Sequence, residues 1–344
     1  MERHYQKIDH LVPRPTGDLH PPPLDRLWEP AYLIPDLETA LPPPPSGRTA
    51  HVSLTGMAYP QLVPSADGAI TRLLLTLPEY SLFPQYGPSL GALYQEFLKT
   101  LPPSIRLTIL THVQMVGKVQ EWLRQANLLK STYVLTLHRD VDFSVWTQDP
   151  YLVAREAGGG DSVLITPPSF ARRNDGLIAP AVASLKGSKL RYTRVPLCIQ
   201  GGNLLIGDDF FLIGIDHPIQ TISQGLIRST LKRPDFQDPA RLDERLHQTL
   251  DPCYREWLDF SRKPIFVGVD DPATVPGEIQ REFTVGGETW HEVLHYGNFQ
   301  HPVYPELSTR QPIFHIDMFI TLAGRDPGEP GKYVVLVGDP KMGA

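Results

Sequence analysis

The sequence predicts a mixed α/β fold of short strands and helices, and three observations lead to that prediction. Apolar runs of strand length recur from about residue 70 onward. Two segments, 89–100 and 116–129, carry apolar side chains at helical spacing. Two further apolar runs are separated only by Asp208-Asp209, which is typical of a β-hairpin. Hairpins followed by a helix recur at intervals of roughly fifty residues, which indicates repeated supersecondary units.

The individual elements follow from the same patterns. Strands are expected at 71–77, 106–111, 133–137, 163–166, 191–195, 204–207, 210–214, 264–269, 313–322 and 333–337, and the longest helix at 241–260. Residues 1–67 are rich in proline, including Pro21–Pro23 and Pro42–Pro45, and proline disfavours both helix interiors and central strands. We therefore expect an extended proline-rich arm at 1–67 that packs on an α/β body at 68–344.

Composition limits the class of partner. The 344 residues carry a net charge of −6, and no basic patch stands out, so neither nucleic acid nor a membrane surface is expected as a partner. No apolar run reaches the length of a transmembrane helix, and no apolar segment follows the N-terminus as in a secretory signal. The chain has two cysteines, too few for a disulfide framework, so a cytoplasmic location is expected.

Three short motifs carry the chemistry: Trp146-Thr147-Gln148-Asp149, Gln200-Gly201-Gly202-Asn203 and His315-Ile316-Asp317. A guanidinium group is planar and presents a fork of donors that matches carboxylates. Asp149 and Asp317 would hold it, and His315 would transfer protons. On a strand, alternation would place His315 and Asp317 on one face. Taken singly, each motif also fits a turn or a hydrogen-bonded core histidine.

Together, the motifs resemble the guanidino-group-modifying family, the arginine-deiminase-like penteins. The resemblance implies a β/α propeller of five ββαβ modules with a central site. It implies that Asp149 and Asp317 grip the guanidinium, and that His315 acts as acid and base. The substrate would be arginine, agmatine, a methylated arginine or a peptidyl arginine, and no cofactor is implied. The residues that would shape the substrate-binding wall are Trp146, Gln200, Gly201, Gly202 and Asn203.

The sequence departs from the family pattern in three ways. Gln200 stands where many members carry Glu, and the interval from Asn203 to His315 is longer than usual. The family's nucleophilic cysteine, in a module beyond His-x-Asp, has no counterpart in this sequence. Cys198 and Cys253 are expected to be poor nucleophiles, because neither has an obvious cationic neighbour. We therefore expect an incomplete propeller whose open edge, near 333–337, favours self-association.

Two alternative functions remain open beside a deiminase-like hydrolase or an inactive relative or fragment of one. His291-Glu292-Val293-Leu294-His295, with His301, fits a zinc-hydrolase motif in which two histidines share a helix face. Gly286-Gly287 and Pro302 leave little room for that helix, and Asn298 stands where the extended motif has Gly, so no metal is expected. The other alternative is a non-catalytic protein that binds guanidinium groups or partners.

Overall fold

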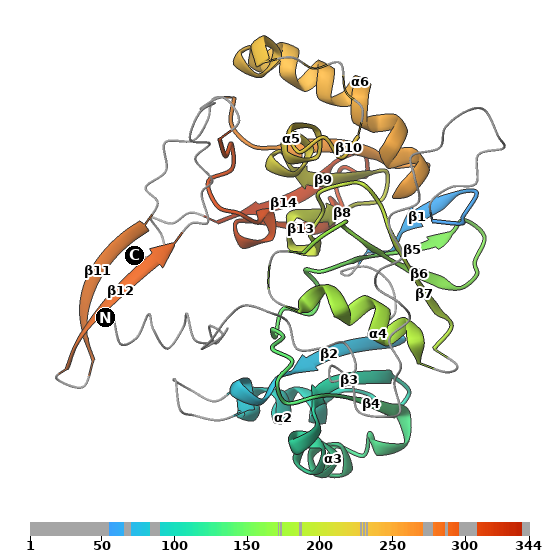
Figure 1. Cartoon of the computed structure of the whole chain (residues 1–344), viewed down its shortest axis with the longest axis vertical. Coiled ribbons are helices and arrows are strands. Elements are labelled where there is room, and N and C mark those ends of the chain that lie inside the picture. Colours follow the sequence, from blue (N-terminus) through green and yellow to red (C-terminus); the bar gives the residue numbers. More distant parts are fainter. Residues whose placement is uncertain are drawn as a thin grey trace.

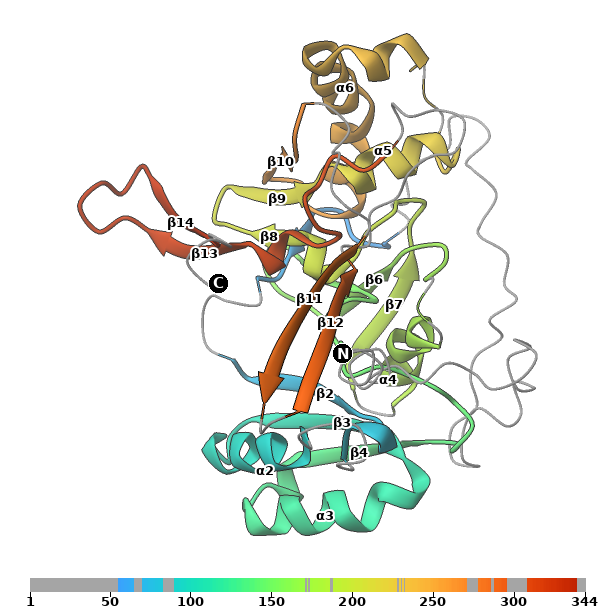
Figure 2. The same cartoon turned by 90° about the vertical axis from the view of Figure 1, so that its left-hand side faces the viewer.

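The chain is a mixed α/β protein with several separate sheets (Figure 1). The computed structural model describes residues 55–64, 70–82, 90–170, 172, 174–185, 188–227, 229, 231, 233–270, 278–285, 288–295 and 308–338. Three units, each a sheet with its helices, follow one another along the long axis of the molecule (Figures 1 and 2). Most of the predicted proline-rich arm lies outside the described residues.

The first unit is a parallel sheet in the order β2-β3-β4. Its strands are β2 (Arg72–Leu77), β3 (Arg106–His112) and β4 (Thr132–Leu137), joined by α2 (Leu90–Thr100) and α3 (Val116–Gln125). The helix predicted at 116–129 ends early because Asn127 adopts a positive φ of 58°, a conformation that terminates helices. The amide of Leu128 then donates to the carbonyl of Leu123 at 2.8 Å, which closes the helix end.

The second unit has a ββαβ order. An antiparallel pair, β5 and β6, is followed by a helix and by a strand parallel to β6. The elements are β5 (Leu152–Glu156), β6 (Ser162–Thr166), α4 (Ile178–Ser184) and β7 (Leu190–Arg194). Within the predicted arm, β1 (Pro60–Leu62) pairs antiparallel with the outer edge of β5, and the amide of Leu62 donates to buried Asp259 at 2.9 Å.

The third unit repeats this order. The predicted hairpin at 204–214 is confirmed as β8 (Leu204–Ile206) and β9 (Phe210–Gly214), and β10 (Lys263–Val267) returns parallel to β9. Two helices connect β9 to β10 along the chain, α5 (Asp216–Ser223) and the long α6 (Pro239–Trp257). The apolar face of α6 packs on the sheet through Leu242, Leu246, Leu250 and Tyr254, each at most 1% exposed. Asp238 caps the start of α6 by accepting from the amide of Arg241.

Two antiparallel ribbons complete the described structure, β11 (Glu278–Val285) with β12 (Glu288–His295) and β13 (Ile320–Arg325) with β14 (Tyr333–Val337). The single strand predicted at 313–322 is wrong in its first half, because a 3₁₀ turn at Ile316–Met318 delays the strand until Ile320. That turn forms because Ile316 is fully buried and its amide is bonded to Asn203. Among the described helices, none is both long and apolar enough to cross a membrane.

Candidate functional site

Each of the three motifs immediately precedes the first strand of a hairpin. Asp149 lies three residues before β5, Asn203 directly before β8, and Asp317 three residues before β13. The motifs thus occupy equivalent positions in successive structural units, and this repetition brings segments that are far apart in sequence to one place. Hydrogen bonds between consecutive motifs show that they are in contact.

The first and second motifs are joined through Gly201. Its amide donates to the carbonyl of Asp149 at 3.1 Å, and its own carbonyl accepts from Gln148 Nε2 at 3.1 Å. A Cβ at Gly201 would lie 2.1 Å from the carbonyl oxygen of Gln148, a separation that no side chain tolerates. Glycine is therefore required here by close backbone approach, and not only by the turn.

The second and third motifs are joined through Asn203, which is fully buried. Its Oδ1 accepts from the amide of Ile316 at 3.2 Å and from Gln311 Nε2 at 2.8 Å. Gln311 Oε1 in turn accepts from Asn203 Nδ2 at 3.3 Å and from the amide of Asp216 at 3.0 Å. This network fixes the segment that carries His315 against β8 and the start of α5. Gln311 belongs to no recognisable motif, so the sequence did not indicate it.

His315 and Asp317 lie together over Gly202. A Cβ at Gly202 would be 2.6 Å from His315 Nδ1 and 2.9 Å from Asp317 Oδ2. We predicted that alternation along a strand would place both side chains on one face. That prediction is wrong, because the two residues do not lie on one strand. His315 is extended and Asp317 lies in the 3₁₀ turn that follows it. The turn nonetheless brings both polar groups to the same glycine.

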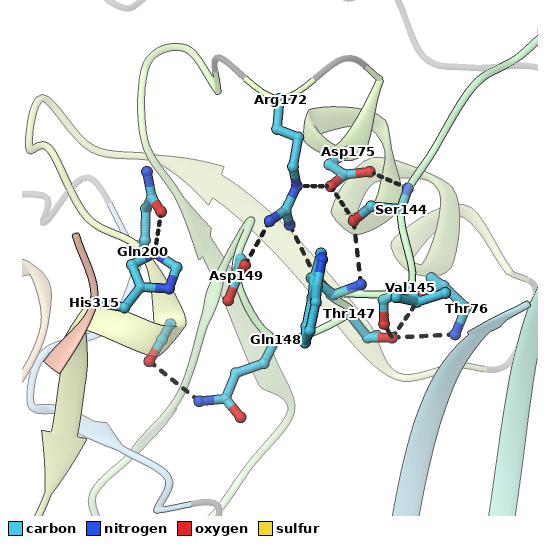
Figure 3. Close-up of polar contacts among 12 residues, drawn as sticks. Thr76, Ser144, Val145, Thr147, Gln148, Asp149, Arg172, Asp175, Gln200 and His315 are labelled. Atoms are coloured by element: carbon cyan, nitrogen blue, oxygen red, sulfur yellow. Dashed lines mark hydrogen bonds and ion pairs between the residues drawn. The ribbon is translucent and has the colours of Figure 1, made fainter. Parts of the chain in front are cut away.

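Asp149 is buried and paired with an arginine that sequence patterns did not indicate. Arg172 Nη1 donates to Asp149 Oδ2 at 2.7 Å, and Arg172 Nε donates to Asp175 Oδ2 at 2.6 Å (Figure 3). Asp175 is fully buried and also accepts from the amide and the hydroxyl of Ser144, at 2.7 and 2.6 Å. The third donor group of the guanidinium, Nη2, reaches the carbonyl of Trp146 at 3.3 Å. The side chain of Trp146 itself is 52% exposed.

The charges in the site act on one another. Burial lowers the pKa of His315, while the negative charge of Asp149 raises it and the positive charge of Arg172 lowers it. The pKa of Asp317 is raised to about 6, first by loss of hydration and then by the charge of Asp149. Asp317 is exposed, whereas His315 and Asp149 are buried. The carboxylate of Asp149 and the guanidinium of Arg172 thus act on His315 in opposite directions.

A second histidine is close enough to His315 to interact with it electrostatically. His217, near the start of α5, is buried, and burial together with the nearby His315 lowers its pKa to about 3. It is therefore neutral at any physiological pH. Its Nδ1 has no hydrogen-bond partner among the described residues.

Neither cysteine has the environment of a nucleophile. Burial raises the pKa of both thiols to about 11, the opposite of what thiolate chemistry requires. The sulfur of Cys198 lies 3.6 Å from Gln224 Oε1, and that of Cys253 lies 3.8 Å from the carbonyl of Thr249. Both are engaged with helical segments on the α5 and α6 side of the third unit.

The segment that fits the zinc-hydrolase motif lies on a strand. His291, Glu292 and His295 belong to β12, so the helical spacing on which the zinc-hydrolase alternative depends is not present. His301 lies outside the described residues. In the described part of the chain, no cluster of three or more potential ligands is placed to hold a metal ion.

Comparison with known proteins finds similarity only to solved structures, and only over part of each chain. No family model matches the sequence, and no curated protein matches it. Among solved structures, the chain is similar to a structural genomics target assigned as an agmatine deiminase, with 9% identity and a TM-score of 0.44, covering 64% of this chain and 58% of that chain. It is similar to the agmatine deiminase of C. jejuni, with 15% identity and a TM-score of 0.36, covering 61% and 56% of the two chains.

A third similar structure is the agmatine deiminase of Enterococcus faecalis, with 12% identity, a TM-score of 0.39, and coverage of 58% and 50%. The resemblance predicted from the three motifs is thus confirmed as a resemblance. The chain spans between half and three-fifths of the length of each of these structures.

Proposed function

We propose that the site binds the guanidinium group of a small or peptidyl ligand between Asp149 and Asp317, and that it belongs to a deiminase-like hydrolase of amidine C–N bonds. One observation carries the proposal: Asp317 and the buried imidazole of His315 meet over Gly202, and Asp149 is near enough for its charge to act on both groups. A planar cation with several donors is the ligand that such a pair of carboxylates suits best.

The same geometry suits proton transfer. His315 contacts Gln200 through Nε2, while Nδ1 lies beside Gly202, close to which Asp317 Oδ2 also lies. A neutral imidazole in that position accepts a proton from a nucleophile or from water and returns it to a departing amine. We further propose that the repeated ββαβ units are blades of a pentein-type propeller, and that Trp146, Gln200, Gly201, Gly202 and Asn203 form the binding wall.

Hydrolysis needs a nucleophile in addition to binding. Attack on the resonance-stabilised guanidinium carbon requires an activated group, and both thiols of this sequence have a raised pKa. Binding and turnover are therefore separate questions. A non-catalytic guanidinium-binding protein would show the first without the second.

The experiment is calorimetric titration of the full chain with agmatine, arginine, dimethylarginine and an arginyl peptide, at about pH 7.5. We expect saturable binding of at least one of these ligands, and a loss of at least tenfold in affinity in Asp149→Asn and in Asp317→Asn. Asp161→Asn, at an exposed position of the β5–β6 turn, is the matched control and should bind like the unmodified chain. Binding that survives both site substitutions would contradict the proposal.

Turnover is measured on the same samples by colorimetric detection of the ureido product. Product that forms in the unmodified chain and disappears in His315→Ala would establish a hydrolase. Ligand binding with no product would establish the non-catalytic alternative.

A further inference from the structure

The first unit carries none of the three motifs, yet it contacts the loop that holds Asp149. Strand β2 lies at the edge of its sheet, in the order β2-β3-β4. The amide of Thr76, in β2, donates to the hydroxyl oxygen of Thr147 at 3.1 Å. The two threonine hydroxyls are 2.7 Å apart, so one of them donates to the other (Figure 3). Two hydrogen bonds thus join the edge of the first sheet to the middle of the first motif.

The hydroxyl of Thr147, and not only its shape, is needed for this junction. Thr76 is completely buried, so water does not offer its amide a replacement partner. Buried backbone N–H groups are nearly always hydrogen-bonded in folded proteins. Valine at position 147 would have almost the same shape as threonine but no oxygen, and it would leave the amide of Thr76 without this acceptor.

The loop that carries Asp149 is held by all three units. From the second unit, Arg172 Nη1 donates to the carboxylate of Asp149 at 2.7 Å. From the segment before β8, the amide of Gly201 donates to the carbonyl of Asp149 at 3.1 Å. The contact with Thr76 is made by Thr147, two residues before Asp149, and it is the contribution of the first unit.

We propose that Thr147 is a positioning residue, whose hydroxyl docks the loop of the first motif on the edge of β2 and so fixes the place of the Asp149 carboxylate. The first unit thereby contributes to the site without supplying a group that touches a ligand. The docking follows from the contacts. Its effect on ligand affinity rests on the proposed function.

The place of Asp149 can be measured through its neighbours. The charge of Asp149 raises the pKa of His315 and of Asp317, whereas Arg172 lowers the pKa of His315. The other titratable group near His315 is His217, which is neutral. A carboxylate that leaves its place acts less on both groups, so both pKa values should fall. A general loss of stability would not produce this change.

The experiment is an NMR titration of the full chain labelled at histidine and aspartate, without ligand, with signals assigned from His315→Gln and Asp317→Asn. In Thr147→Val we expect both pKa values to fall by about 0.3 unit or more, a part of the roughly 1–3 units that a neighbouring charge can produce. Thr147→Ser keeps the hydroxyl and should titrate like the unmodified chain.

The matched control is Thr132→Val. Thr132 is half-buried like Thr147, and its hydroxyl donates to the carbonyl of Leu128 at 2.8 Å. It lies at the start of β4, whereas Thr76 lies near the end of the parallel strand β2, so the two threonines are at opposite ends of the sheet. Thr132→Val should leave the pKa values of His315 and Asp317 unchanged.

Unchanged pKa values in a folded Thr147→Val, or an equal change in Thr132→Val, would overturn the inference. Thermal melts identify any variant that fails to fold. If Thr147→Val does not fold, Thr76→Val carries the same test, because it removes one hydroxyl and leaves the amide bond to Thr147 in place. Its expected fall in the two pKa values is smaller, and unchanged values would again overturn the inference.

Calorimetry with agmatine adds the readout that rests on the proposed function. Thr147→Val should bind about fivefold or more weakly than the unmodified chain, because a misplaced carboxylate meets the ligand poorly, and Thr132→Val should bind equally well. An unmodified chain that binds none of the guanidino ligands would contradict the proposed function, while the ligand-free titration would still decide the role of Thr147.

Discussion

The guanidinium of Arg172 lies 2.7 Å from the carboxylate of Asp149. We propose that the same carboxylate binds the guanidinium of a ligand. Arg172 is anchored at its other side by Asp175, which is completely buried. An arginine of the chain itself thus occupies Oδ2 of Asp149 in the way that we expect of a ligand guanidinium. A ligand must share Asp149 with Arg172 or displace its terminal nitrogen.

Arg172→Gln should destabilise the fold and raise the pKa of His315. Removing one member of a buried ion pair typically costs about 3–5 kcal/mol, and Asp175 would lose its cationic partner. The pKa of His315 should rise because Arg172 now lowers it. Chemical denaturation and a histidine NMR titration measure the two effects. Arg139→Gln, at a side chain that is 74% exposed, should change the free energy of unfolding by no more than about 0.5 kcal/mol.

Gly202→Ala should disrupt the site more than the fold. The added Cβ would lie 2.6 Å from His315 Nδ1, so the imidazole must move. We expect ligand affinity to fall at least tenfold in calorimetry. Gly117→Ala is the matched control: it lies in α3 with no atom within 4 Å of the new Cβ, and replacing a helical glycine should stabilise the chain by up to about 1 kcal/mol. Unchanged affinity in Gly202→Ala would show that the space above residue 202 is not used.

Asp317 should make the chain less stable as the pH rises from about 4 to about 6. Its pKa is about 6 in the folded chain, against an ordinary value of 3.8. Between these values the folded state holds a proton that the unfolded state releases, so the free energy of unfolding falls with rising pH. Below about pH 4 both states are protonated and the effect vanishes. Because Asp317 is exposed, solvent screens this carboxyl and keeps the effect modest.

Asp317→Asn tests this prediction. Relative to the unmodified chain, the variant should be more stable at pH 7 than at pH 4, as measured by urea denaturation at both values. The control Asp161→Asn should show no such difference. An equal effect of Asp317→Asn at the two pH values would mean that the pKa of Asp317 is not raised.

Gln311→Leu should loosen the segment that carries His315. The change leaves Nδ2 of buried Asn203 without Gln311, whereas Oδ1 keeps the amide of Ile316, and an unsatisfied buried group costs about 1–3 kcal/mol. A lower melting temperature and faster hydrogen exchange at Ile316 are the expected results. Gln120→Leu, on the exposed face of α3, should leave both measurements unchanged.

Much of the fold could be predicted from the sequence because local patterns dominate its elements. The strands of the first sheet, the β8–β9 hairpin and α6 follow directly from apolar spacing and turn residues. The prediction failed at Ile316, where a tertiary hydrogen bond from the Ile316 amide to Asn203 Oδ1 accompanies a 3₁₀ turn within an apolar run. No local pattern contains that information.

The site could be predicted only in part for a similar reason. Asp149, His315 and Asp317 could be proposed from the sequence because they belong to motifs. Arg172 and Gln311 were missed because their roles depend on partners that lie 23 and 108 residues away in sequence. Long-range contacts of this kind leave no periodicity and no motif, so only the structure identifies them.

The most direct test of the central claim is whether ligand binding releases a proton from Asp317. A guanidinium bound beside this carboxyl should lower its pKa from about 6, so binding near pH 6 should expel a fraction of a proton, whereas binding at pH 8 should expel almost none. Titration calorimetry with agmatine, in two buffers of different ionisation enthalpy, measures this number. We predict proton release at pH 6 that is lost in Asp317→Asn. Binding at pH 6 with no proton release, or release that persists in Asp317→Asn, would contradict a guanidinium site between Asp149 and Asp317.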